Sequence, residues 1–166
     1  MTVFLCGFMG CGKSTIGKLT AKKLGCGFCD TDELIVKNQG MSIPEIFEKK
    51  GEPYFRETEA QTVKSLCGKP LVVACGGGAM LNPDTAKAVK EAGGKIVFLD
   101  VPFSDCYERI KGDSNRPIVM SSTKEQLEER FRQRYAVYLE NSTVRVECTG
   151  SPVENAELLV NTVKSR

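Results

Sequence analysis

The stretch that decides the fold spans residues 7–15 and reads G-F-M-G-C-G-K-S-T, which satisfies the phosphate-binding pattern G-x-x-x-x-G-K-[ST] in full. A short apolar run, Thr2 to Cys6, precedes it. Apolar residues at helical spacing, from Ile16 to Leu24, follow it. A chance glycine-rich turn would not need these flanks, whereas the motif requires this order of strand, loop and helix. The sequence therefore predicts a nucleoside triphosphate site in an α/β domain.

Each residue type in this loop suits a phosphate ligand. Glycines let backbone N–H groups curl around a phosphate, and the following helix N-terminus adds partial positive charge. Lys13 is expected to reach the β- and γ-phosphates, and the Ser14 hydroxyl is expected to ligate Mg²⁺. The residues expected to contact the nucleotide here are Gly10, Cys11, Gly12, Lys13, Ser14 and Thr15.

Length and composition indicate one soluble globular domain. The chain has 166 residues, of which 41% are hydrophobic and 27% charged, with a net charge of +2. That charge, without any lysine or arginine stripe, does not favour a nucleic-acid partner. No apolar run is long enough for a membrane span, and the N-terminal run lacks the features of a signal peptide. We expect a cytoplasmic monomer with no membrane or nucleic-acid partner.

The cysteines favour packing over metal or redox chemistry. The chain has eight cysteines and no histidine. Cys26-x-x-Cys29 has no second ligand pair for zinc, and Cys29 is expected on a strand rather than at a helix N-terminus. Cys11, beside Lys13, is either a reactive thiol that bound nucleotide protects or a small residue that the loop tolerates. Without histidine, any catalytic base must be a carboxylate, lysine, tyrosine or cysteine.

Strand and helix patterns alternate along the chain, which predicts a parallel sheet with helices on both faces. Strands are expected at 2–6, near 28–32, and at 71–75, 95–99 and 143–148. Helices are expected at 16–24, 33–38, 42–50, 52–66, 84–92, 104–110, 124–139 and 152–164. This is a single domain, residues 1–166, with a substrate-binding insertion at 31–60. A polar, aperiodic segment at 111–123 is expected to be a mobile lid.

Parallel sheets bind ligands at the carboxyl ends of their strands, so the features at those ends should share one crevice. They are the phosphate loop, Asp30-x-Asp32, Gly76-Gly77-Gly78 and the turn near Gly150. No acidic residue follows the strand at Cys75, so Asp30 is the candidate carboxylate for Mg²⁺. Asp32 lies about 6–7 Å further along an extended chain and would face an acceptor hydroxyl. The alternative for this D-x-D is a solvated turn.

Three arginines suit a phosphoryl-transfer site. Arg116, in the polar segment, could close on the transferring phosphate. Arg56 follows Phe55 in the insertion and Arg134 lies within a helix; two arginines that face a pocket suit an acceptor carboxylate, since a guanidinium fork binds one in bidentate fashion. Taken singly, an arginine is more often a solvated surface residue than a ligand-binding one.

Five further motifs, together with the phosphate loop, resemble the shikimate kinase family over almost the whole chain, Val3 to Val163. They are D-T-D at 30–32, F-R-E-T-E at 55–59, G-G-G-A at 76–79, R-P-I at 116–118 and R-x-x-x-Y at 134–138. Nucleotide kinases share only the phosphate loop, so this set is specific. The chain has R-Y-A-V-Y at 134–138 where the family often has R-x-P-L-Y. Its loop at 149–152 is short and lacks an arginine that some members carry.

The resemblance implies a three-layer α/β/α P-loop kinase fold whose five-stranded parallel sheet has the order 2-3-1-4-5. It implies ATP-dependent phosphorylation of the 3-hydroxyl of shikimate, with Mg²⁺, in the pathway to chorismate and the aromatic amino acids. Asp32 would orient or deprotonate the hydroxyl, while Lys13 and Arg116 stabilise the phosphoryl group. Ser14 and, through water, Asp30 would hold Mg²⁺. Shikimate would be held by Asp32, Arg56, Gly76, Gly77, Gly78 and Arg134, and adenine by Arg109 and Pro152.

Three other functions fit part of this pattern. A gluconate-type kinase would normally carry a histidine near its D-x-D counterpart, and a nucleoside monophosphate kinase would lack D-T-D. A regulatory module without catalysis would usually have lost Lys13, Asp32 or Arg116, and the chain retains all three.

Overall fold

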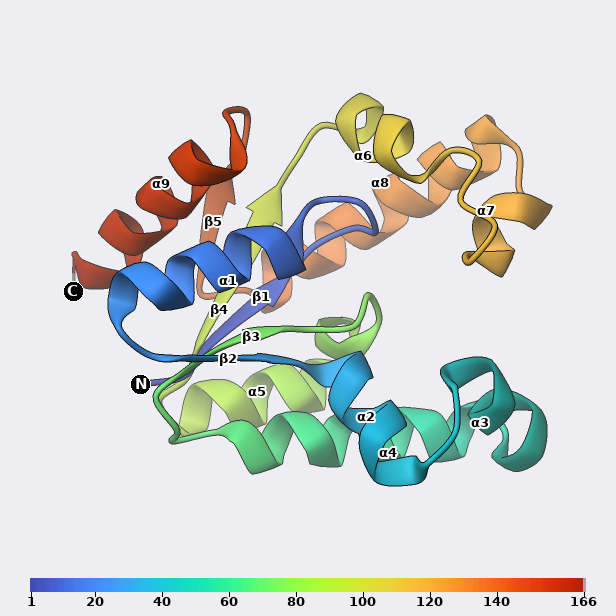
Figure 1. Ribbon diagram of the computed structural model, residues 1–166, viewed down its shortest axis with the longest axis horizontal. Coiled ribbons are helices and arrows are strands. Elements are labelled where there is room, and N and C mark those ends of the chain that lie inside the picture. The colour runs from blue at the N-terminus through green and yellow to red at the C-terminus, as the bar shows by residue number, and fades with distance from the viewer. Residues whose placement is uncertain (166) are drawn as a thin grey trace.

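The structure, a computed structural model, describes residues 1–165 and has a five-stranded parallel sheet at its centre (Figure 1). The strand order is β2-β3-β1-β4-β5, which confirms the predicted sheet. The central strand β1 pairs on both sides, with Leu5 opposite Ala74 of β3 and Val97 of β4. The strands are β1 (Val3–Cys6), β2 (Gly27–Asp30), β3 (Leu71–Ala74), β4 (Lys95–Asp100) and β5 (Val144–Glu147).

The helices connect these strands and cover the sheet on both faces. They are α1 (Lys13–Leu24), α2 (Thr31–Gln39), α3 (Ile43–Lys50), α4 (Glu52–Leu66), α5 (Pro83–Glu91), α6 (Phe103–Ile110), α7 (Pro117–Ser121), α8 (Lys124–Asn141) and α9 (Pro152–Lys164), with a short 3-10 turn η1 (Ala79–Leu81). Helices α1 and α9 lie on one face of the sheet, and α4 and α5 lie on the other (Figure 1). The fold therefore has the three layers that were predicted.

The two sheet faces carry separate cores because successive strand residues point to opposite sides. On one face, Leu5 packs with Ile16 of α1 and Leu159 of α9. On the other face, Phe4 packs with Val63 of α4, and Tyr138 of α8 belongs to the same buried cluster. Near-continuous burial of β1, β3 and β4 is typical of a parallel sheet covered on both faces.

The segment 31–60 builds a small core of its own from α2, α3 and the start of α4. Ile35, Ile46 and Phe55 are buried together. Ser42 caps α3, since its hydroxyl accepts a hydrogen bond from the Glu45 N–H at 3.3 Å. This packing places the insertion and α7 at the same end of the molecule as the phosphate loop (Figure 1).

Two expectations about local structure need correction. Asp32 does not lie on an extended chain: Asp30 caps α2, so the helix begins at Thr31 and Asp32 lies in its first turn. The segment 111–123 is not wholly irregular, since it contains α7, which begins at Pro117, a residue suited to a first helical position. Other boundaries differ from the predicted ones by a few residues.

Among residues 1–165, no helix combines the length and the apolar composition needed to cross a membrane.

Candidate active site

The phosphate loop leads directly into α1 and leaves the first N–H groups of that helix without a side-chain cap. Gly12 takes the N-cap position with a φ of 91°, which favours glycine. Uncapped N–H groups and the helix dipole together favour an anion at this point. A cavity of about 340 Å³ opens here, and Gly10, Gly12, Lys13, Ser14 and Thr15 line it.

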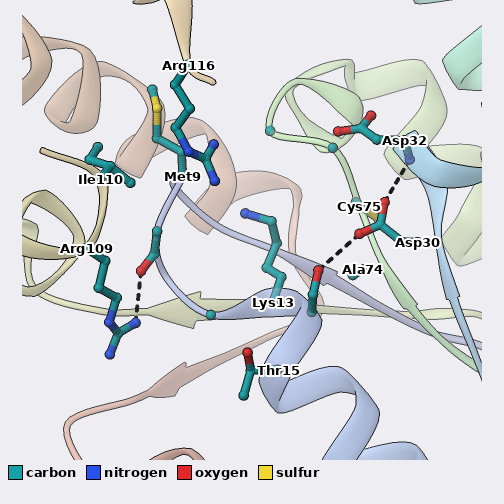
Figure 2. A pocket seen from close by; sticks show the side chains of 15 residues that line it. Met9, Lys13, Thr15, Asp30, Asp32, Ala74, Cys75, Arg109, Ile110 and Arg116 are labelled. Carbon is teal, nitrogen blue, oxygen red and sulfur yellow. Dashed lines mark hydrogen bonds between the residues drawn. The ribbon is translucent and has the colours of Figure 1, made fainter. Parts of the chain in front are cut away.

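Lys13 spans the loop from the inside. Its ammonium donates to the carbonyls of Gly7 at 2.7 Å and Phe8 at 3.2 Å. Figure 2 shows Lys13 pointing into the cavity between Arg116 and Asp32. A cation in this position faces both the loop and the acidic side of the crevice.

Asp30 connects the loop to the start of α2. Its Oδ1 accepts hydrogen bonds from the N–H groups of Asp32 at 2.9 Å and Glu33 at 3.2 Å. Its Oδ2 accepts from the Ser14 hydroxyl at 3.0 Å (Figure 2). The carboxylate is therefore fixed beside Ser14 by three bonds, and Ser14 and Asp30 present adjacent oxygen atoms to the cavity.

These oxygens fit a magnesium ion. Mg²⁺ prefers oxygen ligands and usually takes one or two from the protein, with the remainder from water and substrate phosphates. In the described part of the chain, no group of three histidine, cysteine or acidic side chains could enclose a metal by itself. Ser14 and Asp30 thus match a metal that the nucleotide helps to hold.

Asp32 is the second carboxylate of the crevice. Burial, followed by the charge of Asp30, raises the pKa of Asp32 above its ordinary value, while Lys13, Arg56 and Arg116 oppose the rise. A proton-accepting carboxylate with a raised pKa and three cations around it suits the attack of a hydroxyl on a phosphoryl group.

A second cavity of about 340 Å³ adjoins the first. The residues that line it include Arg56 and Arg134 together with the apolar side chains of Ile43, Phe47 and Phe55. Met9, Asp32, Gly77 and Arg116 line both cavities. The two sites therefore meet at Asp32 and Arg116, which is the arrangement that direct transfer between two bound substrates requires.

Arg56 is held by the buried carboxylate of Glu59 at 3.0 Å and lies 3.6 Å from Glu52. Burial raises the pKa of Glu59, and the guanidinium of Arg56 opposes this rise. Glu59 is 3% exposed. Glu59 belongs to the F-R-E-T-E motif, and its place three residues after Arg56 on one helix is the sequence pattern that indicates this pairing.

The glycine turn after β3 forms the floor between the two cavities. A Cβ on Gly76 would lie 2.6 Å from Oδ1 of Asp32, and one on Gly78 would collide with the guanidinium of Arg56. Tyr138 donates a hydrogen bond to the carbonyl of Gly77 and so fixes this turn to α8. Glycine is needed here because the acceptor-site side chains approach the backbone so closely.

Two further arginines border the nucleotide cavity. Nη1 of Arg109 donates to the Gly10 carbonyl at 2.8 Å (Figure 2). Nε of Arg116 lies 3.1 Å from Oδ2 of Asp113, so this arginine is held by its own segment. Pro152, the first residue of α9, is exposed and does not line this cavity, and neither does the turn at Gly150. The expected inclusion of that turn in the crevice does not hold for this cavity.

The cysteines are all free thiols, and Cys6, Cys11, Cys75, Cys106 and Cys148 are buried. Cys11 is 1% exposed and packs in the core beneath the loop, with its sulfur 3.6 Å from the Lys13 ammonium. Its backbone belongs to the loop, but its thiol does not line the cavity. This placement supports the interpretation of Cys11 as a small tolerated residue.

One lining residue was missed entirely. Arg130 lies on α8 four residues before Arg134 and lines the second cavity with it. The i,i+4 spacing of two arginines on a helix was the available indication, because such residues share a face.

Comparison with known proteins identifies the chain's relatives. A family model described as "Shikimate kinase" matches residues 9–164. The chain belongs to the shikimate kinase family. It is 40% identical to the shikimate kinase of Persephonella marina over 166 residues, which cover 99% of this chain and 97% of that protein. It is 43% identical to the shikimate kinase of Geobacter sulfurreducens over 155 residues, covering 92% and 84% of the two chains.

A solved structure agrees with this assignment. The structure described as "Shikimate kinase from Acinetobacter baumannii in complex with shikimate" has a TM-score of 0.90 and 32% identity, and covers 99% of this chain and 95% of that one. Membership of the shikimate kinase family gives the chain an ATP-dependent kinase activity on a hydroxyl of shikimate. The gluconate-type, nucleoside monophosphate and non-catalytic alternatives are thereby set aside.

Proposed function

We propose that the two adjoining cavities hold ATP and shikimate, and that the phosphoryl group passes between them at Asp32. The observation that carries this proposal is that Asp32 and Arg116 line both cavities. The phosphate loop would bind the nucleotide, with Lys13 at the β- and γ-phosphates. Shikimate would lie on the turn Gly76–Gly78, with its carboxylate toward Arg56 and Arg134 and its 3-hydroxyl toward Asp32.

In this proposal the side chains act mainly by position and charge. Asp32 orients the hydroxyl and accepts its proton as the new O–P bond forms. Lys13 and Arg116 stabilise the negative charge on the transferring group, and Arg116 leaves Asp113 to do so. Closure of residues 111–123 excludes water that would otherwise accept the phosphoryl group.

Ser14 would hold Mg²⁺ directly, and Asp30 would do so through a water molecule. When bound, the ion neutralises charge on the phosphate oxygens. Asp30 meanwhile keeps Ser14 in place through their 3.0 Å hydrogen bond. Thr15 lies beside Ser14 at the start of α1 and lines the same cavity.

The proposal extends to the adenine site and to the localisation, oligomeric state and partners of the enzyme. Arg109, whose Nη1 donates to the Gly10 carbonyl, would contact adenine, and Pro152 would lie on the other side of the base. The enzyme would work as a cytoplasmic monomer on small molecules, without nucleic-acid or membrane partners.

The different placement of the two aspartates provides the test. Asp32→Asn should lower kcat by roughly 10²–10⁴-fold and leave the KM for ATP and the Mg²⁺ requirement near wild type, because only proton transfer is lost. Asp30→Asn should raise the Mg²⁺ concentration that half-saturates the rate. Asp84→Asn, an exposed first-turn aspartate of α5, is the control. Near-wild-type turnover of Asp32→Asn would remove Asp32 from the mechanism.

A further inference from the structure

Arg130 occupies an unusual position for a charged side chain. It lines the acceptor cavity beside Arg134, one helical turn further along α8. Its Nε atom is buried and, within residues 1–165, has no hydrogen-bond partner. A buried unpaired donor on a charged group is costly, so a partner supplied by a ligand would remove a penalty that the free protein carries.

The other arginines of this cavity differ in how their charge is compensated. Arg56 pairs with Glu59 and Glu52, and Arg116 pairs with Asp113. Arg130 and Arg134 form no salt bridge with any residue in the described range 1–165. Burial, followed by the charge of Arg134, lowers the pKa of Arg130. Two guanidinium groups thus line this cavity without a salt-bridge partner among the described residues, although the carboxylates of Asp32 and Glu59 line the same cavity.

We propose that Arg130 is an acceptor-binding residue that shares the carboxylate of the substrate with Arg134. This inference rests on the proposed acceptor site. A carboxylate has two oxygens and about four lone-pair positions, so it can accept from two guanidinium groups at once. Side chains four residues apart on a helix have Cβ atoms about 5–6 Å apart, so Arg130 and Arg134 can reach the same carboxylate, whose remaining lone-pair positions are left for Arg56. Arg130 thereby contributes to selection of an anionic acceptor.

A binding role and a packing role predict opposite effects on stability. If Arg130 serves the ligand, its replacement by an uncharged side chain of similar length removes an unsatisfied buried donor and the repulsion with Arg134. The free protein should then melt at the same or a higher temperature. If Arg130 only packs α8, the same change should lower the melting temperature and affect both substrates alike.

The experiment compares Arg130→Met with Arg132→Met. Arg132 lies on the same helix, has a 65% exposed side chain and pairs only with Glu129 at 3.3 Å, so it controls for loss of one positive charge. Arg130→Met should raise the KM for shikimate roughly 10- to 100-fold, the effect expected of a hydrogen bond to a charged group. The KM for ATP should not change. Arg130→Lys should show a smaller rise, because it keeps the charge but loses the planar fork.

An uncharged acceptor identifies the group that Arg130 binds. In the wild type, replacing the carboxylate of shikimate by a carboxamide should raise the KM. In Arg130→Met this added penalty should be smaller than in the wild type, because the part of it that comes from Arg130 is already lost while Arg134 still contacts the carboxylate, as in a double-mutant cycle. An equal penalty in both proteins would overturn the assignment to the carboxylate, and so would an unchanged KM for shikimate in Arg130→Met.

Arg134→Met, measured in parallel, distinguishes failure of the proposed acceptor site from failure of the role proposed for Arg130. If Arg134→Met raises the KM for shikimate and Arg130→Met does not, the acceptor site is supported and the role of Arg130 is refuted. If neither variant changes this KM, the proposed acceptor site fails and the role of Arg130 fails with it. Circular dichroism spectra of the variants verify that each is folded, and Arg130→Lys supplies the test if Arg130→Met does not fold.

Discussion

At the scale of single residues, Asp30 and Asp32 share one crevice but are held differently. Asp30 accepts three hydrogen bonds, two from backbone N–H groups and one from Ser14. Asp32 is surrounded by cations and by the charge of Asp30, and its pKa is raised by burial first. The first carboxylate is thus held in position by hydrogen bonds, whereas burial raises the pKa of the second.

This difference predicts the acid side of the pH profile. If Asp32 must be ionised for transfer, kcat/KM for shikimate should fall as pH drops below its raised pKa. Asp30→Asn removes a charge that raises this pKa, so the fall should move to lower pH in that variant. Asparagine also preserves the cap of α2, which makes this a mild change. An unchanged or upward-shifted profile would contradict the assignment.

Replacement of Asp32 by asparagine should also raise the stability of the free protein. Because its pKa is raised on folding, the native state binds the proton more tightly than the unfolded chain. The ionised side chain therefore lowers stability as pH rises from the ordinary aspartate pKa through the raised one. Asp32→Asn should melt at a higher temperature than wild type near pH 7, without ligands, and the difference should vanish at acidic pH. A lower melting temperature of the variant at pH 7 would show that the ionised group stabilises the fold.

Loss of the ion pair between Arg56 and Glu59 should lower the stability of the protein by an amount that depends on pH. Arg56→Met leaves the Glu59 carboxylate buried without its partner, which costs about 1–3 kcal/mol. The loss should be larger near pH 8 than near pH 5, because the remaining carboxyl can take up a proton at low pH. Denaturant unfolding at the two pH values measures this. Arg134→Met removes no ion pair of the described chain and is the control; an equal loss in both variants would rule out the pair as the cause.

At the scale of elements, the lid segment 111–123 is held in this structure by local bonds. Arg116 pairs with Asp113, and Val119 is the buried residue of α7. Few contacts therefore need to break for the segment to move, which is the property expected of a closing loop.

If residues 111–123 close over the site, their backbone amides should be protected from hydrogen exchange only when both substrates are bound. Backbone amides of 111–123 should exchange hydrogen fast in the free enzyme and slowly with shikimate and a non-hydrolysable ATP analogue together. Arg116→Ala should lower kcat more than it raises either KM, because its contact forms with the transferring group. Exchange rates that are the same with and without both ligands would count against a lid.

Most elements could be predicted from the sequence because their determinants are local. Buried strands such as β3 are continuous apolar runs, and the N-cap residue of α3 is explicit in the sequence. The start of α2 was misjudged because Asp30 was assigned only to the metal, although aspartate is also a strong N-cap. The helix α7 was missed because only five residues form it, too few for a periodic pattern.

Site residues could be predicted from the sequence when they belong to a motif of known chemistry. Residues whose importance comes from being buried could not. The phosphate loop, Asp32 and Arg116 line one cavity, and their roles there stay predictions. The burial of Glu59 and the lack of a partner for the Nε of Arg130 depend on how α4 and α8 pack, which no single-chain pattern reveals.

At the scale of the whole molecule, the parallel sheet brings distant segments to one end. The loop after β1, the start of α2 after β2 and the glycine turn after β3 all line the nucleotide cavity. The insertion 31–60 and α8 supply the walls of the acceptor cavity. The strand order thus brings two adjoining cavities to one end of the sheet, and in the proposed mechanism the insertion would select the acceptor.

The central claim is that this crevice transfers a phosphoryl group from ATP to shikimate and to no other class of acceptor. The direct measurement is ADP release with ATP and Mg²⁺ in the presence of shikimate, gluconate, AMP or no acceptor, with the product examined by phosphorus NMR. ADP release is expected only with shikimate, and one phosphate ester on the 3-hydroxyl of shikimate should form for each ADP released. Comparable release with gluconate, AMP or no acceptor, or an ester on another hydroxyl, would contradict it.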